Sequence, residues 1–216
     1  MNTNALEKFA QSARRGLLDQ VSARLEQVLA MDTAEFRGRA AAIHDLEKEI
    51  ADSSKKEVIE KVAYTWFNRF CALRFMDANR YLPMGALTPL PGHTEPEIFE
   101  EAKNGLFMPE LKGILNQQKV LDLLDGVEPS SNPQQEAYRM LVVAVCNWLY
   151  QKMPFLFEKI QDYTELLMPL DLLSENSVLY SVREALTDEA CQDVEVIGWL
   201  YQFYISEKKD QVMGAK

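Results

Sequence analysis

The sequence predicts an all-α fold, an irregular multi-helix domain of about seven to ten helices with a central buried helix near residues 55–79. Apolar residues recur at three- and four-residue intervals along most of the chain. No long segment alternates with the two-residue period of a half-buried strand. The 216 residues are 47% hydrophobic and 26% charged, with only nine glycines and nine prolines, which is typical of globular domains.

Two amphipathic stretches open the chain. One apolar stripe runs from Leu6 to Val28 and indicates a helix, or a pair of helices broken near Gly16. A second helix is expected over about residues 33–51, where Phe36 belongs to the apolar face and the opposite face is heavily charged.

The predicted central helix should begin near residue 55, because Asp52, Ser53 and Ser54 supply carboxylate and hydroxyl oxygens that accept hydrogen bonds from its first amides, and should end near Asn79. It contains the sequence VAYTWFNRFCALRFMD from Val62 to Asp77, with five aromatic residues and two arginines. On a helical projection, apolar side chains cover most of the circumference, which is typical of a helix buried by several neighbours. We therefore expect the aromatic rings to form core rather than a platform for stacking bases.

Arg74 is the exception on this helix, because it falls inside the apolar arc between Ala63 and Phe67. A buried guanidinium is costly unless it is paired, and Asp77 lies three residues further along the same surface. We expect an Arg74–Asp77 pair. The alternative is that Arg74 reaches a groove and meets phosphate or another domain.

Loops and shorter helices are expected after the central helix. Prolines and glycines indicate a loop from Arg80 to Thr94, and another from Gly126 to Asn132. Asn132-Pro133 is a typical helix start, and the helix that follows should stop at Pro154. Further helices are expected at 95–103 with Thr94 as N-cap, at 108–115, at 117–124, twice within 155–186 around Pro169, and from Thr187 or Asp193 to about Gln211. We expect one domain over residues 1–216, with possible sub-parts 1–80 and 95–211 sharing a core.

Charge is unevenly distributed along the chain. The net charge of −10 argues against the whole chain being a free-standing DNA-binding domain, since such domains usually carry a basic surface. Residues 1–80 carry 13 Lys and Arg against 12 Asp and Glu, whereas residues 81–216 carry 10 against 21. Any contact with nucleic acid is therefore expected in the first 80 residues; the alternative is a solvated helix face. The candidate residues are Arg14, Arg15, Arg37, Arg39 and Arg74, with Arg24 close to them in sequence.

Cysteine and histidine usage gives little support to catalysis or metal binding. Cys71, Cys146 and Cys191 lie in apolar helical patterns without paired spacing and indicate buried thiols in a reducing compartment. His44 and His93 are isolated, so neither a metal site nor a nucleophile–histidine pair is expected.

Nucleotide and membrane binding are not expected either. No GxGxxG or GxxxxGK[ST] motif occurs. The most apolar run, from Met140 to Tyr150, is much shorter than the ~20 residues that span a bilayer. The N-terminus has no apolar signal segment. We expect a cytoplasmic protein without a membrane partner.

Two blocks of unusual composition, residues 64–77 and residues 196–210 (VIGWLYQFYISEKKD), resemble the N-terminal region of the PglX family. These proteins are the adenine-specific DNA methyltransferases of bacterial BREX (bacteriophage exclusion) defence systems. The resemblance implies that a helical N-terminal region leads into a methyltransferase domain that binds S-adenosylmethionine, followed by a target-recognition region. Catalysis in that family depends on an Asn-Pro-Pro-Tyr loop that holds the flipped adenine.

This sequence lacks the catalytic loop of the family it resembles. The nearest string, Asn132-Pro133-Gln134-Gln135, has neither the second proline nor the tyrosine, and the glycine-rich cofactor turn is missing. We therefore assign no catalytic, cofactor or metal residue and expect the chain to be inactive alone, with S-adenosylmethionine bound elsewhere in the parent enzyme. The partners implied are the rest of the methyltransferase, DNA and other BREX proteins. The alternative is a protein-interaction module that docks defence components or a phage inhibitor through the acidic residues 95–195.

Overall fold

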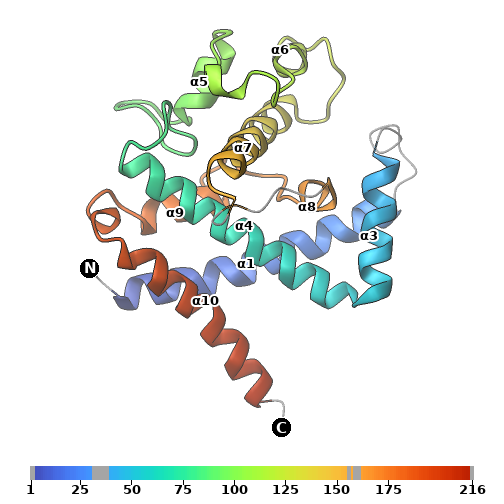
Figure 1. Cartoon of the computed structure of the whole chain (residues 1–216), viewed down its shortest axis with the longest axis vertical. Coiled ribbons are helices and arrows are strands. Elements are labelled where there is room, and N and C mark those ends of the chain that lie inside the picture. Colours follow the sequence, from blue (N-terminus) through green and yellow to red (C-terminus); the bar gives the residue numbers. More distant parts are fainter. Residues whose placement is uncertain (1–2, 31–38, 155–156, 158–161, 215–216) are drawn as a thin grey trace.

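The structure, a computed structural model, describes residues 3–30, 39–154, 157 and 162–214. These residues form nine α-helices and two short 3₁₀ turns, with no strand among them, so the all-α prediction is confirmed (Figure 1). The elements are α1 (Thr3–Ala30), α3 (Ala40–Asp52), α4 (Lys55–Ala78), α5 (Glu97–Lys103), η1 (Pro109–Leu111), α6 (Gln117–Leu124), α7 (Pro133–Lys152), α8 (Asp162–Leu166), α9 (Val178–Ala185), η2 (Ala190–Gln192) and α10 (Glu195–Gly214). None of these helices is long and apolar enough to cross a bilayer.

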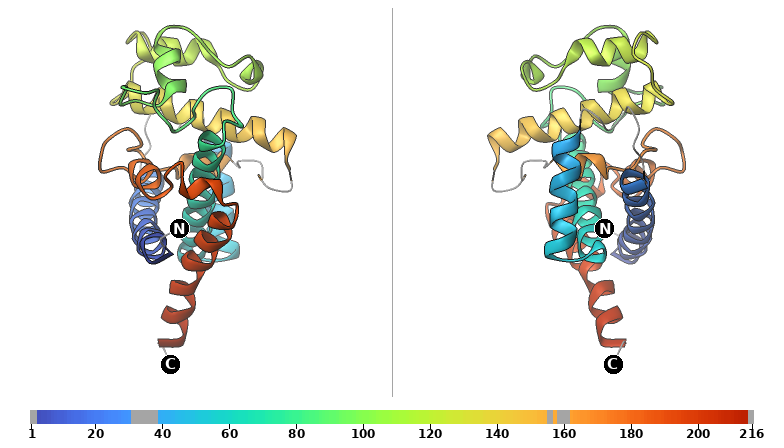
Figure 2. Two further views of the ribbon diagram at one scale, coloured as in Figure 1. Left: turned by 90° about the vertical axis from the view of Figure 1, so that its left-hand side faces the viewer. Right: turned by 90° about the vertical axis from the view of Figure 1, so that its right-hand side faces the viewer.

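The helices form two groups. Helix α1 packs against α4, α9 and α10, and α3 packs against α4 and α8. Above them, α7 packs against α5, η1 and α6, as Figure 2 shows. One continuous cluster of buried apolar side chains joins both groups. The proposed division into sub-parts 1–80 and 95–211 stays a prediction.

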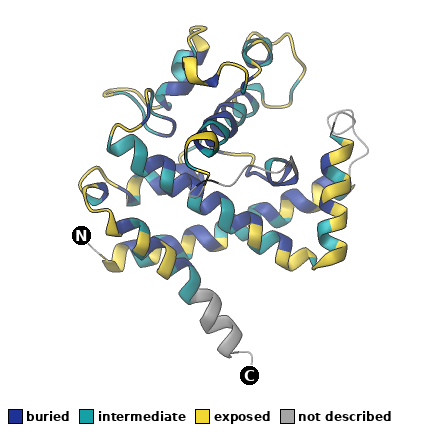
Figure 3. Cartoon of the chain, viewed as in Figure 1, coloured by how far each residue is buried: buried dark blue, intermediate teal, exposed yellow. Residues whose placement is uncertain are grey.

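Helix α4 is the buried central helix that the sequence predicts. Its N-cap is Ser54, whose Oγ accepts a hydrogen bond from the amide of Glu57 at 3.1 Å. Trp66, Phe67 and Phe70 are at most 1% exposed, which confirms that these rings belong to the core. Most of the α4 ribbon is buried or half-buried (Figure 3). The burial of one helix by several neighbours follows from its apolar circumference.

The N-terminal stripe forms one helix rather than two. Helix α1 runs through Gly16 without a break. A mid-helix glycine costs ~1 kcal/mol relative to alanine. Burial of the stripe on both sides of it, including Ala10 and Leu17 at 0% exposure, outweighs that cost. The next helix, α3, is described only from residue 40, and the expected Phe36 contact lies outside the described residues.

Two local predictions after α4 are wrong. Thr94 does not cap α5, because the helix begins at Glu97 and its first amides donate to loop carbonyls instead: Glu97 N to Thr88 O and Ile98 N to Gly85 O, both at 3.1 Å. A Cβ at Gly85 would lie 2.6 Å from Thr88 O, so only glycine allows this close approach.

The second wrong prediction concerns the helix expected at 108–115. That segment holds only the three-residue 3₁₀ turn η1, and a helix is excluded beyond it because Gly113 has a left-handed φ of +80°.

The later helices begin where their capping residues predict. Asn132 accepts a hydrogen bond from the amide of Gln135 at 3.3 Å, and α7 ends at Lys152, two residues before Pro154. Helix α10 begins after Asp193, whose carboxylate accepts from the amide of Glu195 at 2.9 Å. It continues to Gly214, slightly beyond the expected end.

Candidate functional site

Arg14, a candidate for nucleic-acid contact, lies in the core. Its side chain is 0% exposed and its Nη2 donates to both carboxylate oxygens of Glu60, at 2.7 and 3.0 Å. Its guanidinium also lies over the ring of Tyr204, 5.6 Å from the centroid. Arg14 therefore joins α1, α4 and α10 and does not present its charge to solvent.

Arg15 and Arg39 lie nearer the surface. Arg15 is exposed, and its Nε donates to the carbonyl of Gln11 at 3.3 Å. Arg39 is 39% exposed and pairs with Glu165 at 2.7 Å. Arg37 lies outside the described residues. A surface role for this arginine set therefore depends on Arg15 and Arg39.

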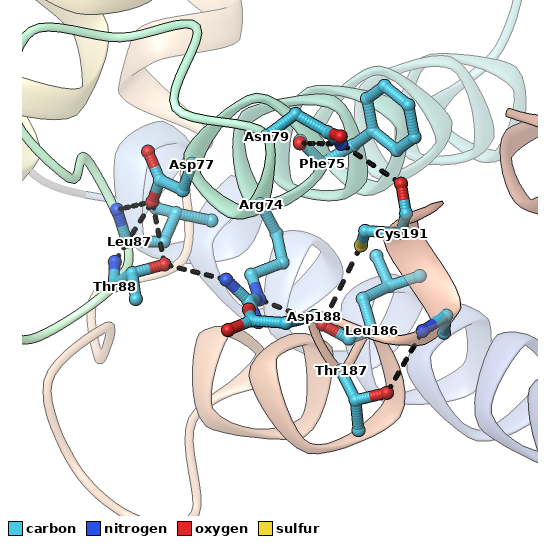
Figure 4. Close-up of polar contacts among 11 residues, drawn as sticks. Arg74, Phe75, Asp77, Asn79, Leu87, Thr88, Leu186, Thr187, Asp188 and Cys191 are labelled. Carbon is cyan, nitrogen blue, oxygen red and sulfur yellow. Dashed lines mark hydrogen bonds and ion pairs between the residues drawn. The ribbon is translucent and has the colours of Figure 1, made fainter. Parts of the chain in front are cut away.

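Arg74 is buried and joins three segments of the chain (Figure 4). Its Nε donates to Leu186 O at 2.8 Å, Nη1 to Thr88 Oγ1 at 3.0 Å and Nη2 to Asp188 Oδ1 at 2.6 Å. The expected direct pair with Asp77 is replaced by a relay, because Thr88 Oγ1 donates in turn to Asp77 at 2.9 Å. The guanidinium binds a residue far along the chain, which no spacing on α4 could predict.

Asp77 holds the loop that follows α4. Its Oδ1 accepts from the amide of Ala86 at 2.9 Å, and its Oδ2 from the amides of Leu87 and Thr88 at 2.8 and 3.0 Å. Burial raises the pKa of Asp77 to about 6, although these donors favour the ionised form and oppose the rise. The carboxylate is thus ionised at neutral pH and orders the loop that in turn caps α5.

Replacing Asp77 with asparagine is expected to lower the free energy of unfolding by about 2 kcal/mol at pH 7, because in either orientation the NH₂ group of the side chain would face at least one backbone N–H donor. Because the pKa of Asp77 is raised on folding, protonation of Asp77 adds a further stabilisation that is fully present below pH ~4 and is lost as the pH rises through about 6. Asparagine does not titrate. The stability difference between wild type and variant should therefore grow by about 2 kcal/mol from pH 7 to pH 4. Urea unfolding at both pH values measures it, and a constant difference would contradict the assignment.

Aromatic rings join the two sequence blocks at residues 64–77 and 196–210. Tyr204 of α10 lies 4.6 Å from Phe67 and 5.3 Å from Tyr64 of α4, measured between ring centroids. Tyr201 lies 6.0 Å from Tyr64. We call these four residues the aromatic seam. The blocks are separated by more than 100 residues in sequence, and their unusual composition reflects packing against each other.

Three arginines converge on the five-residue helix α8. Arg24 Nε donates to Leu166 O at 3.1 Å, Arg139 Nη2 donates to Glu165 O at 3.4 Å, and Arg39 binds the Glu165 side chain. Cations near the last carbonyls of a helix satisfy acceptors that have no intrahelical partner. Sequence reasoning missed Arg24 and Arg139 in this role. Arg24 and Arg139 lie 142 and 26 residues away in sequence from the residues they bind, so no local pattern indicates these contacts.

A groove of about 1240 Å³ opens beside α8. Its walls come from the starts of α6 and α7, the middle of α7, the α8 segment and the loop between α6 and α7. Arg24, Arg39 and Arg139 line it together with Lys119. The groove brings together charges from both halves of the sequence.

The thiols are placed as the sequence predicts. Cys71, Cys146 and Cys191 are free and buried. Burial raises the pKa of the Cys71 and Cys146 thiols, so their nucleophilic thiolate forms are scarce at neutral pH. Among the described residues, no group of three or more His, Cys, Asp or Glu side chains is arranged to hold a metal ion.

No protein-family model matches the chain. Two known proteins match it over its whole length. Adenine-specific methyltransferase BrxX of Escherichia coli O9:H4 (strain HS) is 34% identical over 237 residues, which cover 99% of this chain. Adenine-specific methyltransferase PglX of Lacticaseibacillus casei (strain Zhang) is 30% identical over 262 residues, which cover all of it. The chain is therefore similar over its whole length to two adenine-specific methyltransferases. The resemblance first inferred from two short blocks is therefore confirmed across the full chain.

The chain spans only 19% and 21% of the lengths of these two relatives. Its two blocks are the parts of α4 and α10 that carry the aromatic seam, with Arg14 over Tyr204 at one end. In both blocks, buried rings such as Trp66, Phe67 and Tyr204 contribute to the core.

Proposed function

We propose that this chain is the helical N-terminal region of a BREX adenine-N6 DNA methyltransferase, which uses S-adenosylmethionine to mark host DNA during phage defence in the cytoplasm. The similarity over the whole chain to two adenine-specific methyltransferases, of which it spans about one fifth, carries this proposal. The region supports the methyltransferase domain and takes no chemical part itself. Its sequence contains no Asn-Pro-Pro-Tyr string and no glycine-rich cofactor turn, which supports a non-catalytic role.

The complete methyltransferase, expressed with and without residues 1–216, tests this function. Deletion should remove most N6-methyladenine from host DNA, because a supporting domain stabilises the catalytic one, while the purified segment alone should transfer no methyl group from labelled S-adenosylmethionine. Undiminished methylation after deletion would refute the supporting role. Methyl transfer by the segment alone would refute the non-catalytic one.

Contact with DNA is a second part of the proposal. Among the described candidates, Arg15 is exposed, and the Arg39 side chain is 39% exposed although it also binds Glu165. In the complete enzyme, changing both to glutamine should reduce the slope of log affinity against log salt by about 2, if each neutralises one phosphate. Lys112→Gln, an exposed cation in the acidic part of the chain, is the matched control. Equal slopes for both variants and wild type would leave the region without a DNA role.

The acidic half supports an alternative function, docking of a basic protein partner. Residues 81–216 carry 21 acidic against 10 basic side chains, and such a surface favours partners of opposite charge. Pull-down at low and moderate salt distinguishes the two functions. Retention of a basic defence protein or phage inhibitor, without retention of DNA, would favour the alternative.

A further inference from the structure

The groove beside α8 has the composition of a protein-binding surface. Apolar, amide, hydroxyl and charged side chains all line it. The apolar lining residues include Ile114, Leu115, Met140, Val143, Leu166 and Leu170. Of these, Leu170 is 43% exposed, although it is apolar. A surface that combines apolar and polar side chains is typical of protein–protein contacts, and methionine suits such surfaces because it adapts its shape.

The charges of the groove do not suit a nucleic acid. Four basic and four acidic side chains line it, so its formal charge is zero. Arg24, Arg39 and Arg139 already bind the α8 segment, and Lys119 lies 3.8 Å from Glu136. Phosphate binding needs a surplus of cations that release counterions. A polypeptide with side chains of both signs complements these charged lining residues better than a nucleic acid does.

The size of the groove argues against a small-molecule site. Its volume of about 1240 Å³ exceeds the ~300–1,000 Å³ of most ligand pockets. About four fifths of the length of each relative lies outside the region matched by this chain. If the proposed function holds, that polypeptide is covalently attached, so its effective concentration at the groove is far higher than that of any separate partner.

We propose that the groove beside α8 docks a polypeptide segment from the remainder of the methyltransferase, whose apolar side chains contact lining residues such as Met140 and Leu170 and whose charged side chains of both signs meet the charged lining residues. This inference rests on the proposed function. It adds which surface of the region joins the rest of the enzyme and what kind of segment that surface takes.

Cysteine labelling tests the docking. Leu170→Cys places a thiol in the groove, and Leu106→Cys places one on an exposed turn outside it, where the leucine is 55% exposed. The native cysteines of this chain are at most 3% exposed and contribute little background. Alkylation rates at positions 170 and 106 are measured by mass spectrometry in the 216-residue chain and in the complete enzyme. We expect labelling at position 170 to be about tenfold slower in the complete enzyme, as for a groove occupied nine-tenths of the time, and labelling at position 106 to be unchanged.

Each other outcome excludes the proposal in a specific way. Equal labelling rates at position 170 in both proteins would overturn the docking. Met140→Cys, at a second residue that lines the groove, repeats the same measurement. Protection that appears only when duplex DNA is added identifies DNA as the occupant, and protection lost on dilution identifies a second copy. Methylation by the same enzyme, with and without residues 1–216, is measured in parallel, so failure of the docking is distinguished from failure of the proposed function.

Discussion

Trp66→Ala should lower the free energy of unfolding by about 4 kcal/mol, because the indole is among the largest fully buried side chains and its removal leaves a cavity in the centre of the core. Its ring stacks on Phe70 with 5.4 Å between centroids. Its Nε1 donates to Thr164 O at 3.0 Å, which ties α4 to α8. The alanine variant loses the apolar contacts and leaves this buried carbonyl without its donor.

Thermal and urea unfolding measure the Trp66 effect. The melting temperature should fall by on the order of 10 °C for a chain of this length. Trp66→Phe keeps most of the ring but not the N–H donor, so a loss of about 1 to 2 kcal/mol is expected. Trp199→Ala is the matched control, since that tryptophan lies partly exposed on α10, and it should cost about 1 kcal/mol. Equal losses for Trp66→Ala and Trp199→Ala would contradict the central place of α4.

The sequence predicts α4 well because the information is local. The apolar circumference of residues 55–79 indicates burial by several neighbours, and Ser54 marks the start of the helix. The start of α7 at Asn132-Pro133 is predicted for the same reason. Each signal consists of residues within one or two turns of one another, so no knowledge of the tertiary fold is needed.

The predictions that fail depend on residues far apart in sequence. Thr94 has the right side chain for an N-cap, but the carbonyls of Gly85 and Thr88 reach the α5 amides first, since Asp77 holds their loop in place. Asp77 is on the expected face of α4, but it binds that loop rather than Arg74. In both cases a group far away in sequence occupies the hydrogen-bonding position that local spacing had given to a nearby residue.

The groove could not be predicted from the sequence for a similar reason. Arg39, Arg139 and Leu170 are dispersed over more than 100 residues and meet only because α8 is held between the two helix groups. Charge counts along the chain suggested a nearly neutral first part and an acidic second part. In the folded chain, side chains from both parts line the groove, and its formal charge is zero. The groove therefore lacks the surplus of positive charge that phosphate binding requires.

Arg74→Ala is expected to cost about 3 kcal/mol of folding free energy. The guanidinium is 5% exposed and donates to acceptors on the loop after α4 and on the turn after α9. Removing it leaves Leu186 O without this donor, and the side-chain volume becomes a cavity. Arg74→Lys should still cost about 2 kcal/mol, because an ammonium does not reproduce the fork of donors that contacts three separated oxygens.

The source of the Arg74 effect can be separated with its exposed partner. Asp188 has a side chain 79% exposed, so solvent screens the ion pair, and Asp188→Asn should cost less than about 1 kcal/mol. Arg15→Ala, at an exposed arginine of α1, should change stability by less than about 0.5 kcal/mol. Urea unfolding of the four variants, Arg74→Ala, Arg74→Lys, Asp188→Asn and Arg15→Ala, at pH 7 gives the comparison. If Asp188→Asn proved as damaging as Arg74→Ala, the ion pair would be the main source of stability. We expect Arg74→Ala to be much more damaging than Asp188→Asn. That result would identify the buried hydrogen bonds with Leu186 and Thr88, which join the end of α4 to two distant segments, as the main source of stability.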